Sequence, residues 1–196
     1  IILFYLYLKI LIICFCLMSV ILGSFMGLNQ TSLILLFSYS SINHVGWMLM
    51  SLLMNIYLWI IYFLIYSLIN FILMISFNKL KIFNLNQIFL CKMNLMIYFI
   101  LMNLLSLSGL PPMLGFLSKW MIINFLITEY MYIICFFMIM TSLISMFFYI
   151  RILYSYLMIN FNEYKYYKFS MEKYKILIYM NMLSMISLII ISFFFI

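Results

Sequence analysis

Runs of about 20 apolar residues, separated by short polar breaks, fill almost the whole chain. A helix of this length crosses the hydrocarbon core of a bilayer, which is about 30 Å thick. Of the 196 residues, 70% are hydrophobic and 7% are charged, whereas about a quarter are charged in a soluble domain. Because so few polar groups cannot cover a water-facing surface, the sequence predicts an all-α, polytopic membrane protein.

The positions of the apolar runs predict six transmembrane segments in a single membrane domain over 1–196. The segments cover residues 9–27, 38–54, 56–77, 93–128, 130–158 and 176–196. Residues 1–8 are expected to be the tail of an earlier element, and no stretch between the runs is long enough for a soluble domain.

Basic residues predict the orientation of these segments. If the segments alternate in direction, the breaks at 27–37, 78–92 and 160–175 share one side of the membrane. The second and third of these breaks hold most of the basic side chains, namely Lys79, Lys81, Lys92, Lys165, Lys168, Lys173 and Lys175. The positive-inside rule places them in the cytoplasm or, in a mitochondrion, in the matrix. The net charge of +7 therefore indicates membrane topology and lipid contact, with no nucleic-acid partner.

The fourth segment, 93–128, is too long for one straight span. Its 36 residues would form a helix of about 54 Å, well beyond a core of about 30 Å. Gly109, Pro111 and Pro112 lie within it, and each proline removes a backbone donor and clashes with the preceding turn. The sequence therefore predicts a broken helix at 106–112. Membrane helices are broken in this way only inside protein or beside a wet cavity.

Lys119 follows the break and is the strongest candidate for a functional side chain. A charged lysine at the bilayer centre costs about 2.5–3.5 kcal/mol on insertion scales. In one interpretation it snorkels to an interface, with Trp120 as an aromatic anchor. In the other its amine is buried on the helix and exchanges a proton without a cofactor. Residues 121–127 favour burial, because they stay apolar apart from Asn124.

A second group of polar side chains forms a stripe on the second segment. Ser40, Asn43, His44 and Trp47 follow helical i, i+3, i+4 and i+7 spacing. Such a stripe is expected to face protein or water, not lipid. His44 can relay protons because a neutral imidazole has both a donor and an acceptor. Hydrogen bonding between helices, worth about 0.6 kcal/mol per bond, explains the stripe equally well.

The remaining charged and metal-binding residue types give weaker indications. Arg151 is interpreted as a partner for a carboxylate, a wall of an aqueous path, or an interfacial anchor. Glu129, at a segment junction, is expected to be interfacial. The four cysteines contain no CxxC pair and the chain has one histidine, so no metal site is predicted.

Three stretches resemble a known family. NQTS followed by SYSSINHVGWML at 29–49, LLSLSGLPPMLGFLSKW at 104–120 and FFYIRILYS at 147–155 resemble the antiporter-like membrane subunits of mitochondrial NADH:ubiquinone oxidoreductase, respiratory complex I. The resemblance covers most of 9–155. The absence of alanine suggests an A+T-rich coding sequence, as in an organelle genome.

The resemblance implies roles for particular residues. Lys119 matches the lysine on the broken helix of a second half-channel, which carries protons toward the intermembrane side. His44 falls on a Ser-Ser-x-x-His motif of the family's polar axis, and Gly109, Pro111 and Pro112 match the helix break. No cofactor is expected on this chain, because NADH, FMN, iron–sulfur clusters and ubiquinone belong to other subunits. The implied partners are other membrane subunits of the complex, including neighbouring antiporter-like chains, and lipids.

The sequence differs from the family pattern in two respects. The family has an earlier half with a glutamate–lysine pair, and nothing here matches that half. The chain also begins at Ile1, so it is expected to be the later part of a longer subunit. In addition, 32–38 lacks the basic pair that often precedes the family's Tyr-Ser-Ser motif. The residues leave two alternative functions open: a free-standing cation/proton antiporter and a purely structural membrane scaffold.

Overall fold

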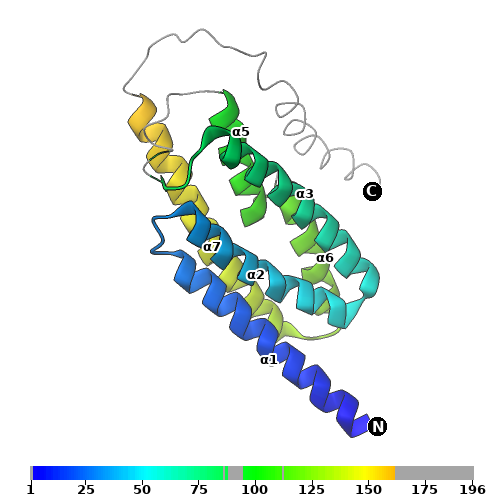
Figure 1. Ribbon diagram of the computed structural model, residues 1–196. Helices are drawn as coiled ribbons and strands as arrows, with labels where there is room; N and C mark the ends of the chain where they lie inside the picture. Colours follow the sequence, from blue (N-terminus) through cyan, green and yellow to red (C-terminus); the bar gives the residue numbers. More distant parts are fainter. Residues whose placement is uncertain (1, 86, 88–94, 112, 162–196) are drawn as a thin grey trace.

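The computed structural model describes residues 2–85, 87, 95–111 and 113–161, and in these residues the fold is all-helical (Figure 1). The helices are α1 (Ile2–Gly27), α2 (Leu33–Met54), α3 (Ile56–Leu80), α5 (Leu95–Ser108), α6 (Leu114–Thr128) and α7 (Tyr132–Phe161). Four of them, α1, α2, α3 and α7, are long and apolar enough to cross a membrane, and α5 and α6 are shorter apolar helices. The predicted all-α, polytopic fold is therefore confirmed.

The helix boundaries follow the predicted segments with local differences. The first helix begins at Ile2, so the prediction that 1–8 is the tail of an earlier element was wrong: 2–8 continues the apolar run of α1. The second segment begins at Leu33, five residues earlier than predicted, because 33–37 is an apolar run that continues the helix. The third extends to Leu80 and includes Lys79, a basic residue that the negative C-terminal end of a helix favours. The fourth is divided into α5 and α6. The predicted sixth segment, 176–196, lies outside the described residues.

A single residue, Asn55, connects α2 to α3. Its backbone is extended, with φ −156° and ψ 133°. The Asn55 side chain accepts a hydrogen bond at 3.0 Å from the backbone N–H of Tyr57, one of the first donors of α3 that has no partner within the helix. One capping residue is therefore enough to end one span and begin the next.

Two of the three breaks that were predicted to share a side, 27–37 and 78–92, meet at one end of the bundle. The backbone N–H of Leu33 donates to the carbonyl of Phe83 at 2.9 Å, and that of Leu85 donates to the carbonyl of Thr31 at 3.1 Å. Arg151 on α7 reaches the same end, where Nη2 donates to the Leu28 carbonyl at 2.6 Å. This position agrees with the interfacial interpretation of Arg151.

Glycines allow α1 and α2 to lie unusually close. A Cβ atom on Gly23 would lie 2.6 Å from the backbone nitrogen of Asn43 and 2.7 Å from the carbonyl oxygen of Tyr39. A Cβ atom on Gly46 would lie 3.0 Å from the carbonyl oxygen of Cys16 and closer still to Val20 and Ser19. Small residues at helix contacts are typical of membrane bundles, where close backbone approach replaces the hydrophobic driving force.

Candidate functional site at the broken helix

The break between α5 and α6 is confirmed, and it covers the connection from Gly109 to Met113. Gly109 follows the last residue of α5 with φ +86°, a left-handed conformation that glycine adopts without steric cost. Its N–H donates to the Ser106 carbonyl at 3.1 Å, which ends the helix. Pro111 lies in the connection, and Pro112 is outside the described residues. After the extended Met113, α6 begins.

The two half-helices cross in close contact. A Cβ atom on Gly115, in the first turn of α6, would lie 1.8 Å from the carbonyl oxygen of Ser106 on α5. No side chain larger than hydrogen fits at such a distance without moving the backbone. Gly115 therefore fixes how α6 returns past the end of α5.

Lys119 lies on the second turn of α6 and its side chain reaches back across the break. The residue is 4% exposed. Nζ donates to the Ser108 carbonyl at 2.8 Å and to the Leu107 carbonyl at 3.4 Å. These carbonyls lie in the last turn of α5, where carbonyl groups lack partners within the helix and carry partial negative charge. Burial was predicted, but the contact with α5 was not.

A further contact comes from the polar stripe on α2. Nζ of Lys119 lies 5.7 Å from the centre of the Trp47 ring, within the range of a cation–π interaction. Glu129 is the only carboxylate in the residues that the structure describes, and it is exposed at the end of α6, ten residues and about 15 Å along the helix. Carbonyl dipoles and an aromatic face, not a carboxylate, therefore stabilise the charged amine within this part of the chain.

The α2 stripe faces protein, as predicted. Ser40, Asn43, His44 and Trp47 are all buried. Nδ1 of His44 lies 2.8 Å from the Tyr62 hydroxyl on α3, and the His44 ring centre lies 4.6 Å from that of Tyr66. Lys119 contacts the same stripe through the ring of Trp47, which follows His44 by three residues on α2. The structure thus brings both predicted site residues into one buried cluster.

Tyr62 and Tyr66 were not singled out from the sequence. Their i, i+4 spacing on α3, continued by Asn70, places all three side chains along one stripe. The Asn70 side chain lies beside the Tyr66 hydroxyl. This regular spacing of polar side chains on an apolar helix was the available indication, but the chain has 17 tyrosines, so such a pattern alone is weak.

A small cavity lies between His44 and the helix break. Its volume is about 10 Å³, close to the minimum that holds one water molecule. It is lined by residues of α2, α3, α5 and α6, namely His44, Tyr62, Ile65, Tyr66, Ile69, Leu107, Gly115 and Ser118. Leu107 both lines this cavity and offers its carbonyl to Lys119. The cavity therefore connects the surroundings of the two candidate proton carriers.

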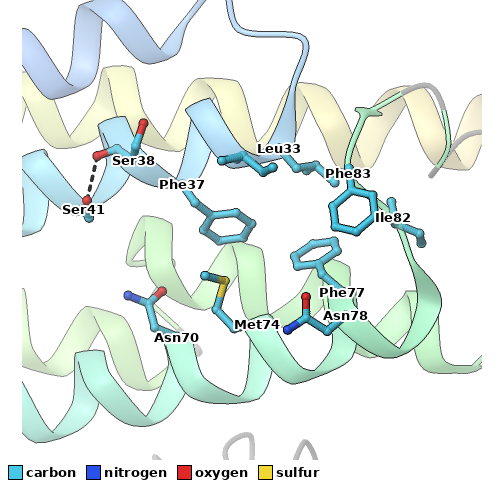
Figure 2. Close-up of a pocket in the computed structure, with 11 residues that line it drawn as sticks. Leu33, Phe37, Ser38, Ser41, Asn70, Met74, Phe77, Asn78, Ile82 and Phe83 are labelled. Atoms are coloured by element: carbon cyan, nitrogen blue, oxygen red, sulfur yellow. Dashed lines mark hydrogen bonds between the residues drawn. The ribbon is translucent and has the colours of Figure 1, made fainter.

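A larger groove of about 550 Å³ lies between α2 and α3 (Figure 2). Aromatic and aliphatic side chains form most of its wall, and Figure 2 shows the rings of Phe37, Phe77 and Phe83 around it. The polar lining residues are Ser38, Ser41, Asn70 and Asn78. Its largely apolar wall suits contact with lipid or a neighbouring helix.

The described cysteines do not form a metal site. In residues 2–85, 87, 95–111 and 113–161, no group of three or more His, Cys, Asp or Glu side chains is placed to hold an ion. Cys16 instead donates its thiol to the Gly46 carbonyl at 2.9 Å, which adds a contact between α1 and α2. Cys91 lies outside the described residues.

Comparison with known proteins identifies the family to which this chain belongs. The family described as NADH:quinone oxidoreductase/Mrp antiporter, TM, matches residues 2–145. The chain belongs to this family of antiporter-like membrane proteins.

More specific relatives share one name. The chain is 42% identical to NADH-ubiquinone oxidoreductase chain 2 of Aedes aegypti over 181 residues, which cover 90% of this chain and 53% of the relative. It is 47% identical to the Anopheles gambiae protein of that name over 148 residues (74% and 43%). For Locusta migratoria the identity is 41% over 172 residues (87% and 50%). The chain spans about half the length of these relatives, and the resemblance seen in its motifs is confirmed.

Proposed function

We propose that the chain is the later part of a chain 2 subunit of NADH:ubiquinone oxidoreductase and forms a proton-translocating half-channel in it. The observation that carries the proposal is the Lys119 amine, buried at a break in a membrane helix and bonded to the carbonyls of the other half. The relatives named chain 2 support the assignment to this complex. The expected location is the mitochondrial inner membrane, with the loops 78–92 and 160–175 on the matrix side.

Two opposing influences allow Lys119 to alternate between charged and neutral forms. Burial away from water is costly for a charged amine. The carbonyls of Leu107 and Ser108 and the ring of Trp47 reduce this cost. A change in water access or in a nearby charge then decides whether the amine holds its proton. His44, which lies beside the water-sized cavity, is the second proton carrier in the proposed path.

Energy for directional transport would come from elsewhere in the complex. NADH, FMN, the iron–sulfur clusters and ubiquinone would be bound by other subunits, and neighbouring antiporter-like chains and lipids would contact the outer faces of the helices. Coupling requires two states whose balance these partners change.

The test is the substitution Lys119→Met in the complete subunit within the assembled complex. Methionine has a similar length but cannot carry a proton, so protons pumped per electron should fall while NADH oxidation and assembly persist. Lys79→Met is the matched control, because Lys79 is exposed at the end of α3. Pumping per electron equal to that of the unmodified complex in Lys119→Met would reject the proposal.

Two other functions make different predictions. A free-standing cation/proton antiporter is compatible with the family description, which includes the Mrp antiporter. That function predicts a small oligomer on a native gel, where the proposal predicts a large redox assembly. A purely structural role predicts that Lys119→Gln keeps full pumping, because glutamine can still donate hydrogen bonds to the carbonyls of α5.

A further inference from the structure

We propose that Tyr62 is a positioning residue that prepares His44 for proton transfer, an inference that rests on the proposed function. The Tyr62 hydroxyl lies 2.8 Å from Nδ1 of His44, and both residues are buried. They come from different helices, α3 and α2, so their contact depends on how these helices pack and not on sequence neighbourhood. A buried imidazole needs such a partner, since an unpaired polar group away from water is costly.

The chemistry of the pair gives each ring nitrogen a separate task. When Nδ1–H donates to the Tyr62 oxygen, Nε2 keeps its lone pair. A proton that arrives at Nε2 makes the imidazolium form, and its release from Nε2 restores the same neutral tautomer. The bond from Nδ1–H to Tyr62 is kept in both states. The ring therefore does not have to turn between uptake and release.

Tyr62 also lines the small cavity beside the helix break. His44, Ser118 and Leu107 line the same cavity, whose wall is almost entirely apolar. The cavity lies between the His44–Tyr62 pair and the end of α5, where Lys119 binds.

Tyr66 provides a matched comparison on the same helix. Its ring also contacts the His44 ring, with 4.6 Å between ring centres. The hydrogen bond to Nδ1 of His44, in contrast, is made by Tyr62, and the Tyr66 hydroxyl lies beside the Asn70 side chain. Tyr62→Phe and Tyr66→Phe therefore remove the same atom, one turn apart, but only the first removes the bond to His44.

The experiment measures protons pumped per electron, at several pH values, in the assembled complex that carries the complete subunit. The titratable side chains that face His44 in the described residues are Tyr62 and Tyr66 from α3 and Lys119 from α6. Tyr62→Phe should lower pumping and shift its pH profile, because the loss of one hydrogen bond changes the population of the productive ring state about fivefold. Tyr66→Phe keeps the His44–Tyr62 hydrogen bond, so it should change both measurements clearly less than Tyr62→Phe does. Tyr62→Phe should add little to His44→Gln, because Tyr62 acts through His44.

Three outcomes would overturn the inference. They are unchanged pumping and pH profile in Tyr62→Phe, equal losses in both tyrosine variants, and losses of Tyr62→Phe and His44→Gln that simply add. The proposed function has its own test in Lys119→Met. If that variant loses pumping while Tyr62→Phe does not, only the role of Tyr62 is wrong.

Discussion

Replacing Gly109 by alanine tests whether the geometry of the helix break holds Lys119 in place. Gly109 has φ +86°, where an alanine is strained by about 1–2 kcal/mol relative to glycine. The added Cβ atom would also lie 3.0 Å from Cδ and 3.3 Å from Nζ of Lys119. The flexible end of the lysine can move by a few tenths of an ångström, so the backbone strain dominates the cost.

This strain is large enough to change the occupancy of the site. If it is relieved by a rearrangement of the break, the balance between the observed and rearranged states shifts about tenfold for each 1.4 kcal/mol. Nζ would then lose its contacts with the carbonyls of Leu107 and Ser108. We expect Gly109→Ala to assemble at slightly reduced yield on a native gel and to pump several times fewer protons per electron.

Two variants separate the effect of the added Cβ atom from that of the backbone strain at Gly109. Gly27→Ala places a Cβ atom 3.2 Å from the Phe148 ring but has no positive φ, so it should pump more protons than Gly109→Ala. Gly109→Asn keeps the added Cβ atom but tolerates the left-handed conformation better, so it should be milder than alanine. Normal assembly and pumping in Gly109→Ala would refute the argument that the left-handed glycine supports the lysine site.

Two further substitutions test the surroundings of the site. Gly115→Ala should abolish assembly of the complex on a native gel. Its Cβ atom would lie 1.8 Å from the Ser106 carbonyl oxygen, and neither backbone can move away at low cost. Normal assembly would show that α5 and α6 do not cross there. Arg151→Gln should weaken the contact of α7 with the Leu28 carbonyl but cost less than about 1 kcal/mol, since the side chain is exposed. A small fall in the thermal stability of the complex, with normal pumping per electron, is the expected measurement, and a loss of pumping would place Arg151 in the proton path.

The helix break and the burial of Lys119 could be predicted because both follow from local constraints. A run of 93–128 exceeds the bilayer, and glycine and prolines within it mark where the helix must end. An apolar sequence after Lys119 indicates that its charge does not lie at the end of a span. These arguments need only the chain's own periodicity and length.

The contacts of Lys119 and His44 could not be predicted in the same way. The bond from Lys119 to α5 depends on the close crossing at Gly115, and the bond from His44 to Tyr62 depends on the packing of α2 against α3. Neither the crossing nor the rotation of one helix against the next is specified by helical spacing. Among so many tyrosines, only the assembled bundle shows which hydroxyl meets the imidazole.

The glycine contacts between α1 and α2 have a mechanical consequence. A Cβ atom on Gly23 or Gly46 would lie within 3 Å of backbone atoms of the other helix. At this packing density the two helices cannot slide or rotate against each other. Together α1 and α2 form a rigid frame that holds Trp47 and His44, both on α2, in place. If the proposed proton transfer involves helix movement, α5 and α6 must move as a pair against this frame, because the Gly115 crossing and Lys119 tie them to each other.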